Sequence, residues 1–229
     1  MKKTIVILSV FLSMMFAVNA QTTKTIAVTA GGLKKALTYN EMQVITHLIL
    51  TGSLDARDFA IMRDRMPNLQ VVDLTKINIV EYSGEEGTKV TKKAKKVNEM
   101  YAAKTIPQYA FYKASNATGK RTIQNVILPK NLVAVGEKAF YACYNLTEVT
   151  FPKTVTSLEA EAYSNCKTLS SITLLGDAPI AKMGKGVFDV VDPSTCILHV
   201  KSGTKEAFSS AKQWENFMNI EEDVVESAE

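Results

Sequence analysis

The sequence predicts an α/β repeat solenoid built from short parallel strands, and two observations support this fold class. A set of apolar and aromatic residues recurs at a fixed offset of 23 residues. A period of this size indicates coils that cannot bury their own apolar faces and must stack on their neighbours. A strand pattern of the form L-x-x-V-x-L also recurs along the chain. The repeated residues are Ala139, Phe140, Cys143, Leu146, Val149 and Phe151, followed by Ala162, Tyr163, Cys166, Leu169, Ile172 and Leu174.

The first 20 residues predict a secretory signal peptide. Lys2 and Lys3 precede an apolar run over residues 5–16, and a small-residue site follows, with cleavage expected between Ala20 and Gln21. The run is shorter than the roughly 20 residues of a membrane span. We therefore expect a mature chain without a transmembrane segment, exported to the cell surface, the medium or the periplasm.

The mature chain is nearly balanced in charge. Without Lys2 and Lys3, the 27 basic residues fall to 25, against 23 acidic ones. The global basic field that would attract nucleic acid is therefore missing, and we expect no nucleic-acid partner. The length suits one elongated domain.

Residues 21–44 predict an N-terminal cap, and residues 45–200 predict the solenoid. In the cap, a β-prone segment runs to Val28, and a short amphipathic helix follows two glycines and ends near residues 39–40. The first solenoid strand is expected at Ile45–Leu50, and a helix should follow it over residues 55–66.

The later coils are the most regular part of the chain. Three consecutive strands begin at Ile123, Leu146 and Leu169. Pro129 and Pro152 follow two of these strands, where a missing N–H ends the strand ladder. The residues predicted to form the repeat core are Leu69, Val72, Leu74, Ile123, Val126, Leu128, Phe140, Cys143, Leu146, Val149, Phe151, Tyr163, Cys166, Leu169, Ile172 and Leu174.

The 23-residue period also locates two insertions. About 25 extra residues separate Leu74 from Ile106, at about residues 81–104, and about six separate Phe111 from Ile123. Insertions in repeat proteins form loops on one face and often carry binding. The lysines of the larger insertion suit an acidic polymer, a phosphate or a sulfated glycan, but they are more typical of a solvated loop. These lysines are Lys89, Lys92, Lys93, Lys95 and Lys96.

Three cysteines leave at least one thiol unpaired in an exported protein. Cys143 and Cys166 occupy the same repeat position, so they should point inward on adjacent coils. There they are either small buried apolar residues or a disulfide, if their Cα atoms lie about 5–6 Å apart. Cys196 is expected to be structural. No CxxC-like pair is present, so no zinc site is predicted.

The segment Leu128–Leu146 follows the pattern L-P-x-x-L-x-x-V-G-x-x-A-F-x-x-C-x-x-L. This pattern resembles the BspA-type leucine-rich repeat of bacterial surface proteins. The resemblance is specific over Ile123–Leu174 and looser over Ile45–Phe111. Glu159 departs from it, because it replaces the glycine found at Gly136. The resemblance implies a leucine-rich repeat fold with a helical cap at each end, surface exposure, and contact with host matrix proteins, mucus or other bacteria.

The regularity fades after Leu174. A last strand is predicted at residues 196–200, followed by a capping helix from about Thr204 to Asn216 within a cap spanning residues 201–220, since an open solenoid end exposes apolar surface. Residues 221–229 are expected to form a frayed acidic tail. The inner face of the helix should hold Ala207, Phe208, Ala211, Trp214 and Phe217.

The sequence contains none of the common catalytic or phosphate-binding motifs, such as H-E-x-x-H, G-x-S-x-G or a Walker loop. Its two histidines, His47 and His199, fall at outward strand positions. Cys196 lies three residues before His199 on one strand, so the two side chains point to opposite sides. We expect no catalytic residue, no cofactor and no metal site, and the protein is not predicted to be an enzyme.

The candidate binding surface is the outward face of the strands. A row of small polar and β-branched residues there is typical of any solvated sheet, and also of a solenoid face that binds peptide or glycan. We expect a non-enzymatic exported binding or adhesion module for a protein or a glycan. The alternative is a periplasmic or secreted accessory protein that binds a glycan or a partner of a nutrient-uptake system. The row consists of Ile49, Asp73, Ile127, Thr150 and Thr173.

Overall fold

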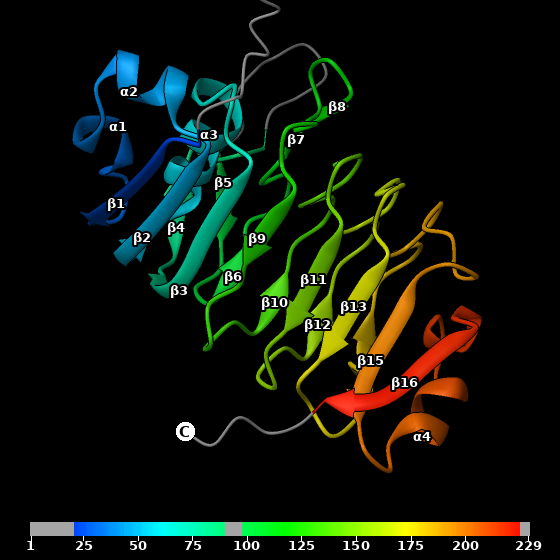
Figure 1. Cartoon of the computed structure of the whole chain (residues 1–229). Coiled ribbons are helices and arrows are strands. Elements are labelled where there is room, and N and C mark those ends of the chain that lie inside the picture. Colours follow the sequence, from blue (N-terminus) through cyan, green and yellow to red (C-terminus); the bar gives the residue numbers. More distant parts are fainter. Residues whose placement is uncertain (1–20, 90–97, 225–229) are drawn as a thin grey trace, which may run out of the picture.

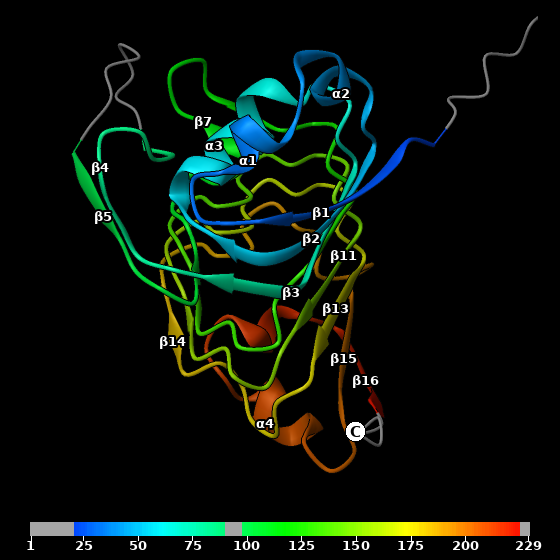
Figure 2. The same cartoon turned by 90° about the vertical axis from the view of Figure 1, so that its left-hand side faces the viewer.

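The computed structural model describes residues 21–89 and 98–224, which form a solenoid of stacked coils (Figure 1). Figure 2 shows the coils following one another from the N-terminal cap at the top to the C-terminal cap at the bottom. The predicted fold class is confirmed, because the coils are joined by short parallel strands. The predicted signal peptide, residues 1–20, lies outside the described residues.

Two four-stranded parallel sheets follow one another along one side of the solenoid (Figure 1). The side-chain amide of Asn125 donates a hydrogen bond to the carboxylate of Glu148 where the two sheets meet. In chain order, the first sheet contains β1 (Thr23–Val28), β2 (His47–Leu54), β3 (Val71–Ile79) and β9 (Asn125–Ile127). The second contains β11 (Glu148–Phe151), β13 (Ser171–Leu174), β15 (Ile197–Lys201) and β16 (Asn219–Val224).

A third parallel sheet lies on another side of each coil and is built from two-residue strands. Its strands are β6 (Thr105–Ile106), β10 (Ala134–Val135), β12 (Ser157–Leu158) and β14 (Lys182–Met183). The space between this sheet and the longer strands holds one continuous apolar core. Every residue expected in the repeat core is buried there. Burying one Leu, Ile or Val side chain stabilises the fold by about 1.5–3 kcal/mol, so the stack of inward residues dominates its energetics.

Aromatic rings form a ladder through the core. Each ring lies 4.9–6.2 Å from the next, measured between centroids, and the ladder runs from α3 (Ala56–Arg65) to the C-terminal cap. Ring pairs at such distances contribute about 0.5–1.5 kcal/mol beyond the area they bury. The rings belong to Phe59, Phe111, Phe140, Tyr163, Phe188 and Trp214.

In each coil, the segment that follows the short strand of the third sheet carries the aromatic residue of the ladder, and we call it the return segment. In three return segments a non-glycine residue in the left-handed region lies two positions before the aromatic residue. Their φ angles are 60° at Tyr109, 52° at Lys138 and 55° at Glu161. In this conformation each N–H points along the stack and donates to a carbonyl oxygen of the next coil at 2.8–3.0 Å. The hydrogen bond between coils offsets the backbone strain of about 1–2 kcal/mol.

The position after the short strands is occupied in turn by Pro107, Gly136, Glu159 and Gly184. A Cβ atom on Gly136 or on Gly184 would collide with the backbone of the preceding coil. Glu159 lies between the two glycines along the stack. The Glu159 carboxylate accepts a hydrogen bond from the Ser157 hydroxyl at 3.0 Å.

The N-terminal cap contains two short helices, α1 (Leu33–Ala36) and α2 (Tyr39–Val44), where one helix ending near residues 39–40 was expected. The break falls at Thr38, which caps α2 in a reciprocal arrangement with Glu41. The carboxylate of Asp58 on α3 accepts hydrogen bonds from backbone N–H groups of the α1 turn at 2.7 and 3.0 Å. This contact fastens the cap to the first full coil.

Both insertions form antiparallel hairpins. The larger contains β4 (Tyr82–Gly84) and β5 (Glu99–Tyr101), and the smaller contains β7 (Tyr112–Lys113) and β8 (Thr118–Gly119). Arg63 of α3 is buried between them and donates to backbone carbonyl oxygens of both insertion regions, at 2.7 Å to Thr88 and 3.3 Å to Tyr112. The described part of the larger insertion is thus anchored to the solenoid.

The C-terminal cap differs from the single helix expected over residues 204–216. The structure has α4 (Lys205–Ser209) and a separate 3-10 turn, η1 (Trp214–Asn216). Between them Gln213 takes a φ of 70°. Its side-chain amide accepts from the Val187 N–H at 3.1 Å and donates to the Gly184 carbonyl at 2.7 Å. The helix is therefore interrupted at Gln213, whose side chain is hydrogen-bonded to the last return segment.

The expected inner face of the cap is correct for the aromatic residues and wrong for one alanine. Phe208, Trp214 and Phe217 are buried, but Ala207 is exposed, because the chain turns after α4. The expected frayed tail is also corrected: residues 221–224 belong to β16, which adds a parallel strand beside β15. Residues 225–229 lie outside the described residues.

All three cysteines are buried free thiols. The Cys166 thiol donates to the Phe140 carbonyl oxygen of the preceding coil at 3.2 Å, and Cys143 makes a longer contact of the same kind with Phe111. Burial raises the pKa of Cys143 and that of Cys196 to about 12. Of the two interpretations left open for Cys143 and Cys166, the structure shows the buried thiols. Such thiols are not reactive nucleophiles.

Candidate functional site

The outward strand positions form a line in each of the two long sheets. In the first sheet, Ile49, Asp73 and Ile127 are register partners, and Thr25 of β1 precedes them. In the second sheet, Thr150 pairs with Thr173. The line continues beyond the predicted members through His199 and Glu221. We call these eight positions the outward row: Thr25, Ile49, Asp73, Ile127, Thr150, Thr173, His199 and Glu221.

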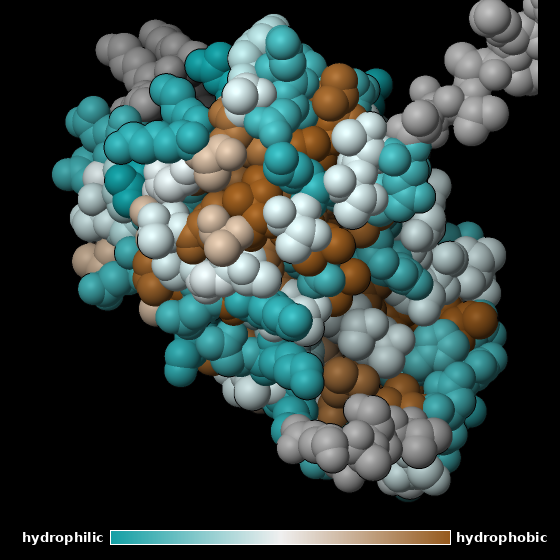
Figure 3. Space-filling view, turned by 60° about the vertical axis from the view of Figure 1, so that its left-hand side comes forward, coloured by the Kyte–Doolittle hydropathy of each residue, from teal (hydrophilic) through white to brown (hydrophobic). Residues whose placement is uncertain are grey.

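The outward row is mixed in chemistry. Ile127 is 41% exposed, and Thr150 is also exposed. The Asp73 carboxylate accepts a hydrogen bond from the Thr75 N–H at 2.8 Å, which occupies one oxygen in a local turn. Hydrophobic and hydrophilic residues are likewise interspersed on the side of the molecule that Figure 3 shows. A surface of this kind suits a macromolecular partner better than a small-molecule ligand, which requires an enclosed pocket.

The lysine-rich insertion is only partly described. Lys89 forms an ion pair with Glu99 at 2.7 Å, and its N–H donates to the Tyr101 hydroxyl. Lys89 therefore holds the hairpin together rather than presenting an unpaired charge. The other four predicted lysines, Lys92, Lys93, Lys95 and Lys96, lie outside the described residues.

A tyrosine cluster on the return segments was not predicted from the sequence. Tyr109 and Tyr112 stack at 6.0 Å, and Tyr112 meets Tyr141 of the next coil edge-on at 4.8 Å. Tyr144 lies close by in the chain, with the guanidinium of Arg121 5.2 Å from its ring centroid. These rings are half-buried. Burial and a hydrogen bond to Glu137 raise the pKa of Tyr109, so its phenol stays neutral.

The signal for this cluster was present in the repeat. Tyr112 and Tyr141 each follow the inward aromatic residue of a return segment, so the repeat itself places them on neighbouring coils and on the outer side. The cluster was not predicted, because tyrosines scattered among polar residues show no regular spacing of their own.

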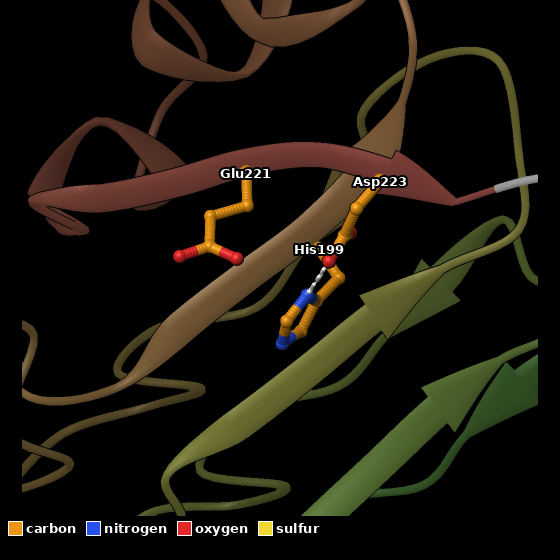
Figure 4. A group of neighbouring side chains, drawn as sticks. All are labelled: His199, Glu221 and Asp223. Atoms are coloured by element: carbon orange, nitrogen blue, oxygen red, sulfur yellow. Dashed lines mark hydrogen bonds and ion pairs between the residues drawn. The ribbon is translucent and has the colours of Figure 1, made fainter.

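His199, Glu221 and Asp223 come together at the C-terminal end of the outward row (Figure 4). The imidazole Nδ1 of His199 lies 2.9 Å from the Asp223 carboxylate. One potential ligand atom from each of the three residues lies within 4.8 Å of the other two. This group was not predicted from the sequence, because residues 221–229 were expected to form a frayed tail. The period could have revealed it, since 23 residues beyond Leu198 a further strand is due.

A recess of about 640 Å³ lies between the last return segment and the C-terminal cap. Its walls include the exposed side chains of Val190 and Met218, together with Lys185 and Lys212. None of the three residues clustered around His199 lines this recess. Among the described residues, no helix has the length and apolar character needed to cross a membrane.

Comparison with known proteins agrees with the stacked parallel coils. The family model for the BspA type leucine rich repeat region matches residues 104–225 in six copies. The chain belongs to this family. BspA-type leucine-rich repeats are repeat modules, and membership indicates a role in protein–protein interaction.

One solved structure similar to this BspA-type chain is a leucine-rich repeat protein from Bacteroides ovatus. The two share 16% sequence identity with a TM-score of 0.41, and the match covers 72% of this chain and 40% of the other. This chain thus spans less than half the length of that protein. No curated protein matches the chain.

Proposed function

We propose that this BspA-type chain is an exported, non-enzymatic module that binds a partner protein at the bacterial surface through its outward row. The observation that carries the proposal is the register of that row within each of the two long sheets, which meet where Asn125 of β9 hydrogen-bonds Glu148 of β11. A solenoid presents such a row as an extended surface, and a protein partner can contact several coils at once. Membership of an interaction family supports the same function.

The arrangement of the polar residues is consistent with a non-enzymatic role. Cys196, which immediately precedes β15, is fully buried, while His199 faces outward on that strand, so the two do not form a catalytic pair. The other thiols are buried in the core with raised pKa values. Binding then depends on shape and surface chemistry rather than on an activated nucleophile.

The first experiment is an array of host matrix proteins, mucins and glycans probed with the mature chain. We expect binding to a protein, and at least tenfold weaker binding when Thr150 and Thr173 are both changed to Lys. Thr156→Lys is the matched control, because Thr156 is an exposed threonine of the same coil but lies beside the third sheet. Equal losses in both variants would contradict the assigned face.

Location is tested separately from binding. Protease treatment of intact cells should release the protein if it is exposed at the surface, and the mature chain should begin at Gln21. Protection of the protein in intact cells, with release only after the outer envelope is opened, would support the periplasmic alternative.

A glycan is the second candidate ligand, and the tyrosine cluster favours it. Tyrosine rings combine an apolar face with a hydroxyl group, which suits the two kinds of surface that a sugar presents. Tyr112→Ala and Tyr141→Ala should abolish glycan binding, whereas Tyr39→Ala should not, since Tyr39 is 70% exposed in the N-terminal cap. Glycan binding that survives both cluster variants would exclude this surface.

A further inference from the structure

The C-terminal end of the outward row brings three metal-ligating side chains together through sheet register. His199 of β15 pairs directly with Glu221 of β16. The register then shifts between His199 and Lys201, so that Lys201 pairs with Val224. A bulge of this kind redirects side chains, and here Asp223 lies beside the His199 imidazole (Figure 4).

We propose that His199, Glu221 and Asp223 bind a divalent transition-metal ion, for which Zn²⁺ is a suitable probe. One nitrogen and two carboxylate oxygens lie within 4.8 Å of one another. Around a metal with bonds of about 2.0–2.2 Å, ligand atoms lie roughly 3–3.5 Å apart. Glu221 and Asp223 are exposed, so side-chain rotation alone can close the remaining distance.

The donor set selects the class of metal. Imidazole suits zinc, copper, iron and nickel, whereas calcium and magnesium prefer sites made only of oxygen. Three protein ligands leave a fourth position for water or for a donor group of a partner, as in open zinc sites. The site lies on the outward row, where a partner's donor group can reach it.

The neighbouring charges leave these three groups available. Lys201, the next outward residue on β15, lies 2.8 Å from the Asp177 carboxylate, and Glu222 accepts a hydrogen bond from the Lys205 N–H. Within the part of the chain that the structure describes, the side chain of Glu221 makes no hydrogen bond or ion pair. Glu221 thus has no cationic partner and lies near the His199–Asp223 pair, and a bound cation would supply the counter-charge.

A bound ion would also cross-link the last two strands of the solenoid. β16 is the terminal strand and has a neighbour on one side only. The metal would join β16 to β15 through side chains, in addition to the backbone hydrogen bonds. Metal binding should therefore stabilise the folded state, because the ligand binds the folded chain and not the unfolded one. This inference does not depend on the proposed partner.

The test is calorimetric titration of Zn²⁺ into the mature chain, purified without a polyhistidine tag and treated with chelator. We expect one ion per chain, and at least tenfold weaker binding to His199→Ala and to Glu221→Gln. His47→Ala is the matched control, since His47 is also an outward histidine, on β2, and its Nδ1 contacts Thr46. It should bind Zn²⁺ like the unmodified chain.

Glu221→Gln also separates a metal site from a folding defect. Because the Glu221 side chain is exposed and unpartnered, the variant should melt at the same temperature as the unmodified chain without metal, and Zn²⁺ should raise only the melting temperature of the unmodified chain. Absence of binding, equal binding by Glu221→Gln, or equally tight binding of Ca²⁺ would each overturn the proposal and leave a simple ion pair between His199 and Asp223.

Discussion

Replacing Tyr163 with Phe should stabilise this protein. The Tyr163 side chain is fully buried, and its hydroxyl makes no hydrogen bond within the described residues. Burial raises the pKa of Tyr163 well above its ordinary value, so the group stays a neutral phenol. The same ladder position carries phenylalanine on the neighbouring coils, at Phe140 and Phe188. Burying the Tyr163 hydroxyl therefore destabilises the folded state, and phenylalanine fills the same position without it.

The magnitude follows from two opposing contributions. A buried hydroxyl without a partner costs about 1–3 kcal/mol. Removing it leaves a void of roughly one atom, which costs a few tenths of a kcal/mol at about 24 cal/mol per Å³. The phenylalanine ring keeps the stack on Phe140, whose centroid lies 4.9 Å away with a 9° angle between the rings. We expect a net gain of about 1–2 kcal/mol in the free energy of unfolding.

Urea denaturation of the mature chain, followed by circular dichroism, measures the effect. With a slope of about 2–3 kcal/mol per M, Tyr163→Phe should raise the midpoint by about 0.5 M. Phe140→Tyr is the reverse control and should lower it, because it adds a hydroxyl to an equally buried position. A lower midpoint for Tyr163→Phe would refute the reasoning, since it would show that the hydroxyl is hydrogen-bonded in solution.

Three further predictions concern the coils. Leu169→Ala should lower the free energy of unfolding by about 2–5 kcal/mol, as for other buried leucines. Thr150→Ala should leave it nearly unchanged, because Thr150 is exposed. Equal changes in the urea midpoint of the two variants would refute the assigned faces. Gly184→Ala should cost about 1–3 kcal/mol by overpacking against Ala160, and an unchanged melting temperature would show that the coils can separate locally. Burial lowers the pKa of Lys120 to about 8. The unfolded chain then binds more protons above pH 8, so stability should rise between pH 8 and 10.5 by up to about 1.4 kcal/mol per pH unit, and a Lys120→Met variant should lack this rise in unfolding titrations.

The inward positions of the coils could be predicted because the information is local. A residue such as Leu146 or Leu169 repeats at one fixed spacing, and stacking makes each coil bury the same positions as the last. The insertions could be located for the same reason, since any excess over the period must loop out. Their conformation could not, because the hairpins depend on Arg63, which is distant in sequence from the carbonyl groups it binds.

The outward row was predictable in part. The period aligned Asp73, Ile127, Thr150 and Thr173, and the structure pairs Asp73 with Ile127 and Thr150 with Thr173. Lys89 was assigned to a binding surface, but its pairing with Glu99 depends on how the hairpin folds. A lysine-rich composition cannot show which charge is paired inside the loop and which is presented to solvent.

The sequence by itself determined the solenoid and the faces of its strands, because coils with the same apolar pattern bury those residues by stacking with them inward. The tertiary structure decided how the stack ends. The capping helix stops early because Gln213 binds the open edge of the last return segment, and the chain then adds β16. Only that added strand brings Glu221 and Asp223 to His199, since their meeting depends on register and on a bulge between separate segments.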